Sequence, residues 1–192
     1  MDAAMKVRKG ALRTALGYIE KNPEDNLTRL MDWVDKLAGD GPDSFHAQRA
    51  AFRNVLNEPG CGMHQLILNV LRDVDNSVIR TVFENFFLNA CLIGWPRQEQ
   101  YREKLGCSIP WAILMDPTSA CNLRCTGCWA AEYGNKLNLT YNELSGIIRQ
   151  GKELGTYMYI FSGGEPLVRK QHLLRLCREH SDCQFLAFTN GT

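Results

Sequence analysis

The sequence has almost no excess of charge of either sign. Its 192 residues include 22 lysines and arginines against 21 aspartates and glutamates, so the formal net charge at pH 7 is +1. Proteins that bind nucleic acids or anionic membranes through a broad electrostatic field carry a marked excess of basic residues. The balanced charge therefore gives no indication of a nucleic-acid partner or of a membrane-surface partner.

Long apolar runs and export signals are missing as well. The most apolar stretch, residues 86–95, is about half of the ~20 residues that a helix needs to cross a bilayer, and Asn89 interrupts it. The N-terminus lacks an apolar segment followed by a small-residue cleavage site, so we expect no signal peptide. We therefore expect a cytoplasmic protein without a membrane span, whose cysteines are mostly reduced thiols.

The composition that is present is typical of a folded protein. Hydrophobic residues make up 45% of the chain and charged residues 22%, which argues against disorder over most of the length. A chain of this length can form one domain with a substantial core, or two small ones.

Residues 1–108 predict an α-helical N-terminal region, because apolar residues recur at helical spacing between glycine and proline breaks. We expect helices at about residues 5–20, 24–37, 44–56, 63–92 and 98–105, the fourth either continuous or broken near residue 75. In the fourth, residues spaced by four predict a buried stripe: Leu66, Val70, Val74, Val78, Val82 and Phe86. The region has no metal-ligand spacing, and we expect it to serve packing or partner binding.

Residues 109–192 change to short apolar runs that alternate with helical segments. We expect strands at residues 111–115, 157–161 and 185–188, and helices at residues 140–154 and 170–179. Thr140 and Glu143 form the sequence pattern of a helix-capping box, and Gly155 is expected to end that helix. Short apolar strands separated by helices need crossover connections, so the pattern predicts an α/β fold with a parallel sheet.

The sequence ends at Thr192, directly after the third expected strand. Three parallel strands and two helices are too few to cover both faces of a parallel sheet. We expect either a fragment of a longer protein, which we favour, or another element that covers the open edge.

Three of the eight cysteines lie close together after the first expected strand. Cys121, Cys125 and Cys128 are separated by three and two residues, and such a loop can aim three sulfurs at one centre. A disulfide would use only two of them, and structural zinc would need a distant fourth ligand. Chance proximity without a ligand role is a third alternative. The spacing favours an iron–sulfur cluster with three cysteine ligands, which would leave one of four irons open for catalysis.

A second motif, Gly163-Gly164-Glu165-Pro166, follows the second expected strand. Two glycines allow a positive φ and a close approach of a ligand to the backbone, and Glu165 could accept hydrogen bonds from an ammonium group. The alternative is a plain loop or the end of a helix. Because loops after neighbouring parallel strands share one edge of the sheet, we expect this turn to lie beside the cysteine loop.

Together these motifs closely resemble the radical S-adenosylmethionine (radical SAM) superfamily. The resemblance covers residues 109–192 and includes Thr189-Asn190-Gly191 after the third expected strand. It implies a TIM-like partial (βα)6 barrel, of which this sequence holds the first three strands, preceded by the all-α region of residues 1–108. It further implies a [4Fe-4S] cluster on the three cysteines, with S-adenosyl-L-methionine chelated at the open iron.

The same resemblance implies roles for individual residues. Glu165 and the backbone of Gly163 and Gly164 would hold the amino group of S-adenosylmethionine, and Asn190 would line the site. An external electron donor of the flavodoxin or ferredoxin type would drive cleavage to methionine and a 5′-deoxyadenosyl radical, which abstracts hydrogen from a C–H bond. The family often has an aromatic residue near the adenine, just before the third cysteine. Glycine occupies that position here, and whether Trp129 takes the role is open.

We therefore expect a radical SAM enzyme that acts on an unidentified substrate, with a peptide or protein as the class that the helical region favours. The alternatives are a non-catalytic zinc-binding or iron–sulfur redox-sensing protein, and an inactive fragment. Without the later barrel strands, we expect this chain to bind a cluster but to be a poor catalyst.

Overall fold

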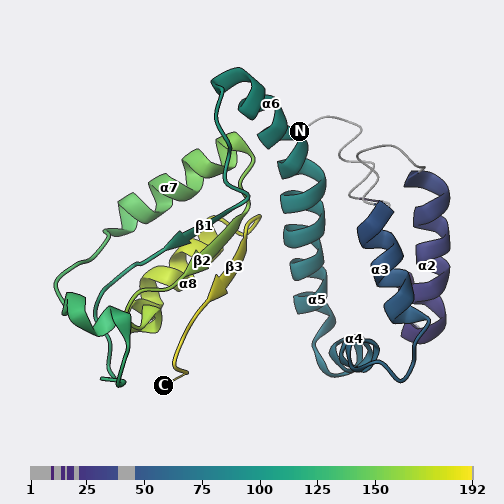
Figure 1. Cartoon of the computed structure of the whole chain (residues 1–192), viewed down its shortest axis with the longest axis horizontal. Coiled ribbons are helices and arrows are strands. Elements are labelled where there is room, and N and C mark those ends of the chain that lie inside the picture. Colours follow the sequence, from purple (N-terminus) through teal and green to yellow (C-terminus); the bar gives the residue numbers. More distant parts are fainter. Residues whose placement is uncertain (1–9, 11–13, 16, 20–21, 39–45, 192) are drawn as a thin grey trace. The chain divides into compact units, whose positions relative to one another are not determined.

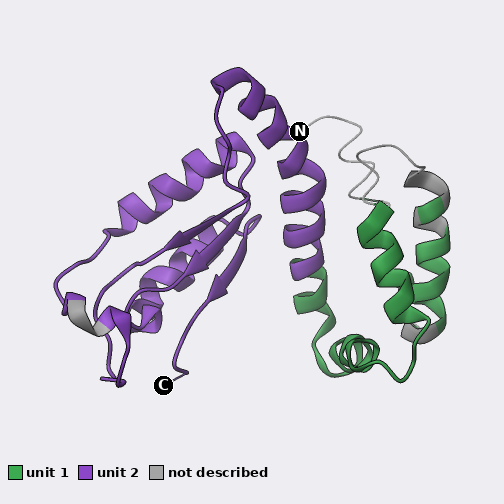
Figure 2. Cartoon of the chain, viewed as in Figure 1, with its two compact units in different colours: residues 1–81 green, residues 82–192 purple. Residues whose placement is uncertain are grey.

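The computed structural model describes residues 10, 14, 15, 17–19, 22–38 and 46–191. The chain divides into two compact units, residues 1–81 and residues 82–192 (Figure 2). Most of the helix expected at residues 5–20, and the first two residues of the one expected at 44–56, lie outside the described residues. None of the helices in the described part of the chain has the length and apolarity needed to cross a membrane.

The first unit is helical throughout its described part. Its helices are α2 (Pro23–Ala38), α3 (His46–Leu56), α4 (Gly62–Asp73) and most of α5 (Asn76–Val82). Helices α2, α3 and α4 pack against one another around buried Leu27, Met31 and Leu56. Arg53 of α3 forms ion pairs with both Asp32 and Asp35 of α2. The helices expected at residues 24–37 and 44–56 are confirmed over their described residues.

The buried stripe predicted for residues 66–86 is wrong. Leu66, Val70, Val78 and Val82 are exposed, by between 41% and 54%. The break that the sequence allowed near residue 75 is confirmed, since α4 ends at Asp73, α5 begins at Asn76 and Val74 between them has an extended backbone (φ −96°, ψ 137°). Two short helices that meet at such a break do not share one continuous face, so a spacing of four residues across it no longer marks a single side.

The second unit is built on a three-stranded parallel sheet, in the order β1 (Ala112–Met115), β2 (Met158–Phe161) and β3 (Gln184–Ala187). Met115 pairs with Phe161, which in turn pairs with Ala187. The crossover helices are α7 (Tyr141–Leu154) and α8 (Lys170–Glu179). All five elements confirm the predicted α/β pattern.

Both crossover helices cover the same face of the sheet. Leu144 and Ile148 of α7 and Leu176 of α8 are fully buried with Tyr159 and Phe161 of β2, in one core cluster. Each such side chain contributes roughly 1.5–3 kcal/mol of burial free energy. Consecutive parallel strands with both crossover helices on one face occur in (βα) barrels and also in each half of a doubly wound sheet. The fold is thus consistent with a partial radical SAM barrel.

The boundaries of α7 follow from local chemistry. The hydroxyl of Thr140 accepts a hydrogen bond from the Glu143 N–H (3.2 Å), and the Glu143 carboxylate accepts one from the Thr140 N–H (2.7 Å). The predicted capping box is therefore confirmed. Gly155 ends the helix with a left-handed backbone (φ 98°), and its N–H donates back to Gly151 and Lys152 carbonyls.

Helical residues 83–105 belong to the same compact unit as the sheet (Figure 2). They form a π-helix, η1 (Phe83–Gly94), followed by α6 (Trp95–Leu105). Three buried amides of this segment donate hydrogen bonds to carbonyls of the loops that precede β2 and β3. The bonds run from Asn85 to Cys183 (2.9 Å) and Ser181 (3.0 Å), from Asn89 to Asp182 (2.8 Å) and from Gln98 to Gly155 (2.8 Å). The domain boundary expected at residues 108–109 remains a prediction.

Candidate functional site

The three sequence motifs lie at the carboxyl ends of the three parallel strands. The cysteine loop follows β1, the Gly163-Gly164-Glu165 turn follows β2 and Asn190 follows β3. Figure 1 shows the loop with its short 3-10 helix η2 (Trp129–Tyr133) and the segment after β3 at the same end of the sheet. In parallel α/β folds this edge is where binding and catalytic groups gather.

The glycine turn is hydrogen-bonded to the stem of the cysteine loop. The Gly164 N–H donates to the Thr118 carbonyl (3.0 Å), and the Glu165 N–H donates to the Ala120 carbonyl (2.8 Å). These bonds extend the pairing of β1 and β2 beyond the strands. They anchor the backbone at the residue that directly precedes Cys121.

Close backbone packing explains both glycines. Gly163 has a positive φ of 99°, and a Cβ there would lie 2.6 Å from the Thr118 oxygen. A Cβ on Gly164 would lie 2.6 Å from the Ser119 oxygen and closer still to that of Ala120. A close approach to these glycines was expected of a ligand, but here the backbone of residues 118–120 makes it.

The carboxylate of Glu165 joins the ends of β2 and β3. It is only 2% exposed and accepts hydrogen bonds from the Leu167 N–H (2.8 Å), the Thr189 hydroxyl (2.8 Å) and the Asn190 N–H (2.7 Å). Desolvation raises the pKa of Glu165, but these hydrogen bonds outweigh it, so the pKa lies below its ordinary value. Glu165 is therefore held as a carboxylate.

Asn190 reaches from the end of β3 to the cysteine loop. Its side-chain amide donates to the Asn122 amide oxygen (3.0 Å) and lies 3.9 Å from the sulfur of Cys121. The structure thus brings Cys121, Glu165 and Asn190 together from three different loops, although 69 residues separate the first from the last.

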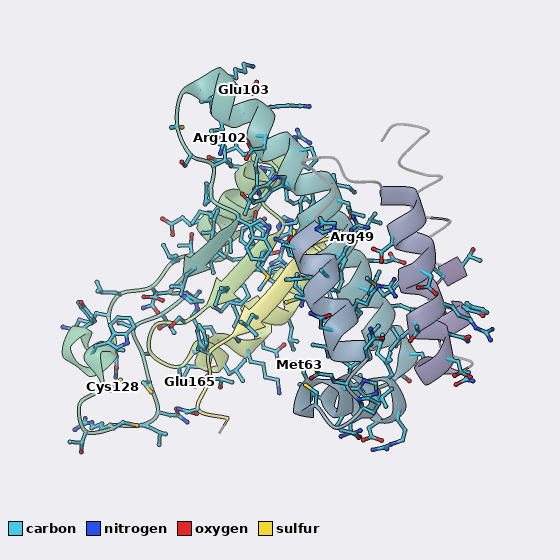
Figure 3. The ribbon with its side chains drawn as sticks, turned by 45° about the vertical axis from the view of Figure 1, so that its right-hand side comes forward. Arg49, Met63, Arg102, Glu103, Cys128 and Glu165 are labelled. Atoms are coloured by element: carbon cyan, nitrogen blue, oxygen red, sulfur yellow. The ribbon has the colours of Figure 1, made fainter. Side chains whose placement is uncertain are left out.

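The three cysteines are free thiols. Cys121 is half-buried, whereas Cys125 and Cys128 are exposed. Figure 3 shows Cys128 on the outer loop and Glu165 nearer the sheet. In the described part of the chain, no three histidine, cysteine, aspartate or glutamate side chains stand in an arrangement that could hold a metal ion.

The base of the cysteine loop is closed. The Ser119 N–H donates to the Leu137 carbonyl (2.8 Å), beside an antiparallel bridge between Thr118 and Asn138. Arg169, directly before α8, donates to the Pro117 carbonyl (2.9 Å) and also to that of Leu139. The two ends of the loop, residues 117–119 and 137–139, are therefore held next to each other by hydrogen bonds.

A cavity of about 260 Å³ lies between this loop and the glycine turn. The rings of Trp129 and Tyr133 meet edge to face in its wall, with centroids 5.9 Å apart. The cavity is lined by Asp116, Thr118, Ser119, Trp129, Ala130, Tyr133, Leu137, Asn138, Gly163 and Gly164. Trp129, Gly163 and Gly164, which the sequence analysis named as site residues, thus line the same cavity.

Comparison with known proteins agrees with this geometry. Residues 115–192, from the end of β1 onward, match the family model of the Radical SAM superfamily. This segment belongs to the radical SAM superfamily. It holds all three motifs and both crossover helices.

A similar protein supports the same assignment. GTP 3′,8-cyclase of Geobacter sulfurreducens is 38% identical over 86 residues, which cover 41% of this chain and 26% of the cyclase. The match thus spans about a quarter of the cyclase's length. No solved structure matches the chain.

The donor set of the radical SAM segment fits an iron–sulfur cluster, which cysteine thiolates typically bind. Three thiols without a disulfide lie within one loop, and two of them are exposed. Their sulfurs do not converge on one centre in this structure. The fit therefore rests on the chemistry and loop position of the donors.

Sequence reasoning missed seven of the ten residues that line the cavity, among them Asp116, Tyr133 and Asn138. Asp116 had a usable signal, because it directly follows the last residue of β1 and so stands at the functional edge. Tyr133 and Asn138 had none, since they reach the cavity only through the closure of the cysteine loop.

Proposed function

We propose that this chain provides the cluster-binding part of a radical SAM enzyme that acts on a C–H bond of an unidentified substrate. Cys121, Cys125 and Cys128 hold a [4Fe-4S] cluster, and S-adenosyl-L-methionine binds beside it. The observation that carries the proposal is the position of three free thiols on a loop whose stem is hydrogen-bonded to the Gly163-Gly164 turn. Together, the bound groups supply one-electron cleavage of the sulfonium C–S bond and a 5′-deoxyadenosyl radical.

The chain's own task is to orient the cofactor and to exclude water. We assign the cavity beside Trp129 and Tyr133 to part of S-adenosylmethionine, since sites for whole drug-sized ligands measure about 300–1,000 Å³ and this one about 260 Å³. Aromatic walls suit a purine ring, which stacks on them. Asp116 supplies an anionic acceptor in the same wall.

The roles of the glycine turn divide between backbone and side chain. A carboxylate has about four acceptor positions, and Glu165 uses three of them within the protein. We therefore propose that Glu165 is mainly a positioning residue and that the backbone of Gly163 and Gly164 holds the cofactor's ammonium group. Direct contact between Glu165 and that ammonium stays a prediction.

The electron comes from an external donor of the flavodoxin or ferredoxin type. The exposure of Cys125 and Cys128 leaves this side of the loop accessible to such a donor. A reducing compartment, as in the cytoplasm, keeps the three thiols free for metal binding. A peptide or protein substrate remains the class that we favour.

The test is anaerobic reconstitution of the chain with iron and sulfide, followed by electron paramagnetic resonance of the reduced protein. S-adenosylmethionine should change the cluster signal, and 5′-deoxyadenosine release reports any cleavage. Cys125→Ala should lose the cluster. Cys107→Ala, which removes another exposed free thiol outside the motif, should keep it. Zinc in place of iron, or a cluster that survives Cys125→Ala, would overturn the proposal.

A further inference from the structure

The side chain of Asn190 contacts Cys121, one of the three proposed cluster ligands. The Asn190 amide has two N–H donors. One is directed at the Asn122 oxygen (3.0 Å), and the same nitrogen lies within hydrogen-bond distance of the Cys121 sulfur (3.9 Å). Sulfur is a weak, large acceptor, for which contacts up to about 4 Å count as hydrogen bonds.

The backbone that carries this amide is held by a separate set of bonds. Both oxygens of buried Glu165 accept hydrogen bonds from the loop after β3, one from the Thr189 hydroxyl and one from the Asn190 N–H. The Gly191 N–H then closes the loop onto the Thr189 hydroxyl (3.1 Å). A side-chain substitution at Asn190 leaves these anchors in place, because only the backbone of that residue takes part in them.

We infer that Asn190 is a positioning residue that donates an N–H···S hydrogen bond to Cys121 and thereby raises the reduction potential of the cluster. The inference rests on the proposed function, since it requires a cluster on Cys121. Reduction adds one electron, which the external donor supplies, and no bond forms or breaks. The added negative charge spreads over the ligand sulfurs, so an N–H donor stabilises the reduced state more than the oxidised one.

This role differs from a merely structural one. If Asn190 only tied two loops together, its loss would lower stability without changing the electronic properties of an assembled cluster. A net hydrogen bond is worth a factor of about three to ten in an equilibrium constant. The ratio of reduced to oxidised cluster at a fixed potential should therefore fall by that factor when the donor is removed.

The experiment is a redox titration of the reconstituted full chain, followed by electron paramagnetic resonance, with iron and sulfide content measured in every sample. Asn190→Ala removes the donor. Asn190→Asp keeps the size of the side chain but replaces the amide donor by an acceptor. Asn135→Ala and Asn135→Asp are matched controls at an exposed asparagine of the cysteine loop, between η2 and α7. The Asp control measures the effect of one added charge.

We expect both Asn190 variants to retain the cluster and to shift its midpoint potential downward, by up to about 59 mV for a tenfold change. The Asn135 variants should shift it less. An intact cluster with an unchanged potential in Asn190→Ala would refute the inference alone. Loss of the cluster in both Asn190 variants would also refute it, because Asn190 would then be needed for assembly. A wild-type chain that takes up no cluster would instead defeat the proposed function itself.

Discussion

Substitution of Gly164 by alanine tests the contact on which the site depends. The added Cβ would lie 2.6 Å from the Ser119 oxygen and 2.6 Å from the Ala120 carbonyl carbon. Both neighbours are backbone atoms, so no flexible side chain can move aside. The two loops must separate, and the bonds from the Gly164 and Glu165 N–H groups to the cysteine-loop stem then lengthen or break.

The magnitude follows from these two effects. Overpacking costs typically about 1–3 kcal/mol, and each lost hydrogen bond costs about 0.5–1.5 kcal/mol. We expect Gly164→Ala to lower the free energy of unfolding by about 2–5 kcal/mol. The opposite sign is expected where alanine fits, because it restricts the unfolded chain and favours helix by about 0.5–1 kcal/mol over glycine.

The assay is urea denaturation followed by circular dichroism. Gly146→Ala is the matched control: Gly146 lies within α7, and a Cβ there would meet nothing within 4 Å. The control should unfold at the same or a higher urea concentration than the unsubstituted chain. A Gly164→Ala variant as stable as the Gly146→Ala variant would refute the packing argument. A variant that loses stability but still binds iron and sulfide normally would refute the dependence of the site on this contact.

Two further predictions follow from groups near the sheet. The pKa of Glu165 lies below the ordinary 4.5, so its stabilising effect is present above pH 4.5 and is lost as the pH falls through the lower folded value. The Glu165→Gln variant lacks this carboxylate, so its stability should not fall in the same way as the pH drops below 4.5. The same dependence of stability on pH in the variant and in the unsubstituted chain would contradict the prediction. Burial raises the pKa of the Cys183 thiol to about 12, so iodoacetamide at pH 8 should label exposed Cys125 and Cys128 of the native protein far faster than Cys183. Mass spectrometry of the labelled peptides measures this, and equal rates would contradict it.

Local chemistry made much of the second unit predictable. Residues close together in the sequence determine three of its features: the capping box at Thr140, the end of α7 at Gly155 and the short apolar strands. The same holds for the order of the motifs, because each directly follows a strand. Parallel pairing then brings them to one edge without further information.

What the sequence could not reveal depends on long-range contacts. The carboxylate of Glu165 meets Asn190, 25 residues away, and nothing near either residue encodes that bond. The glycines predict a close approach, but only the fold shows that the approaching atoms belong to residues 118–120. The prediction of a buried stripe over residues 66–86 was wrong because it treated these residues as one helical face, whereas α4 and α5 are separate helices.

The buried amides of η1 and α6 bear on where the structural unit that carries the candidate site begins. The change of sequence pattern falls at residues 108–109, whereas the compact units meet between residues 81 and 82. The two positions differ because the spacing of apolar residues indicates whether a segment is helix or strand, whereas the compact units depend on which segments contact one another in the fold. Asn85, Asn89 and Gln98 satisfy carbonyls of the loops that precede β2 and β3.

A chain that began at residue 109 would leave those carbonyls without their donors. Water would take the place of the amides at the uncovered carbonyls, so the loss is the net value of the hydrogen bonds, about 0.5–1.5 kcal/mol for each of the four. That cost is a large fraction of the 5–15 kcal/mol by which a domain is normally stable. The amino ends of β2 and β3 are thus held by helices that the family match, which starts at residue 115, does not include. We therefore treat the compact unit of residues 82–192, and not only the segment that holds the motifs, as the unit that carries the site.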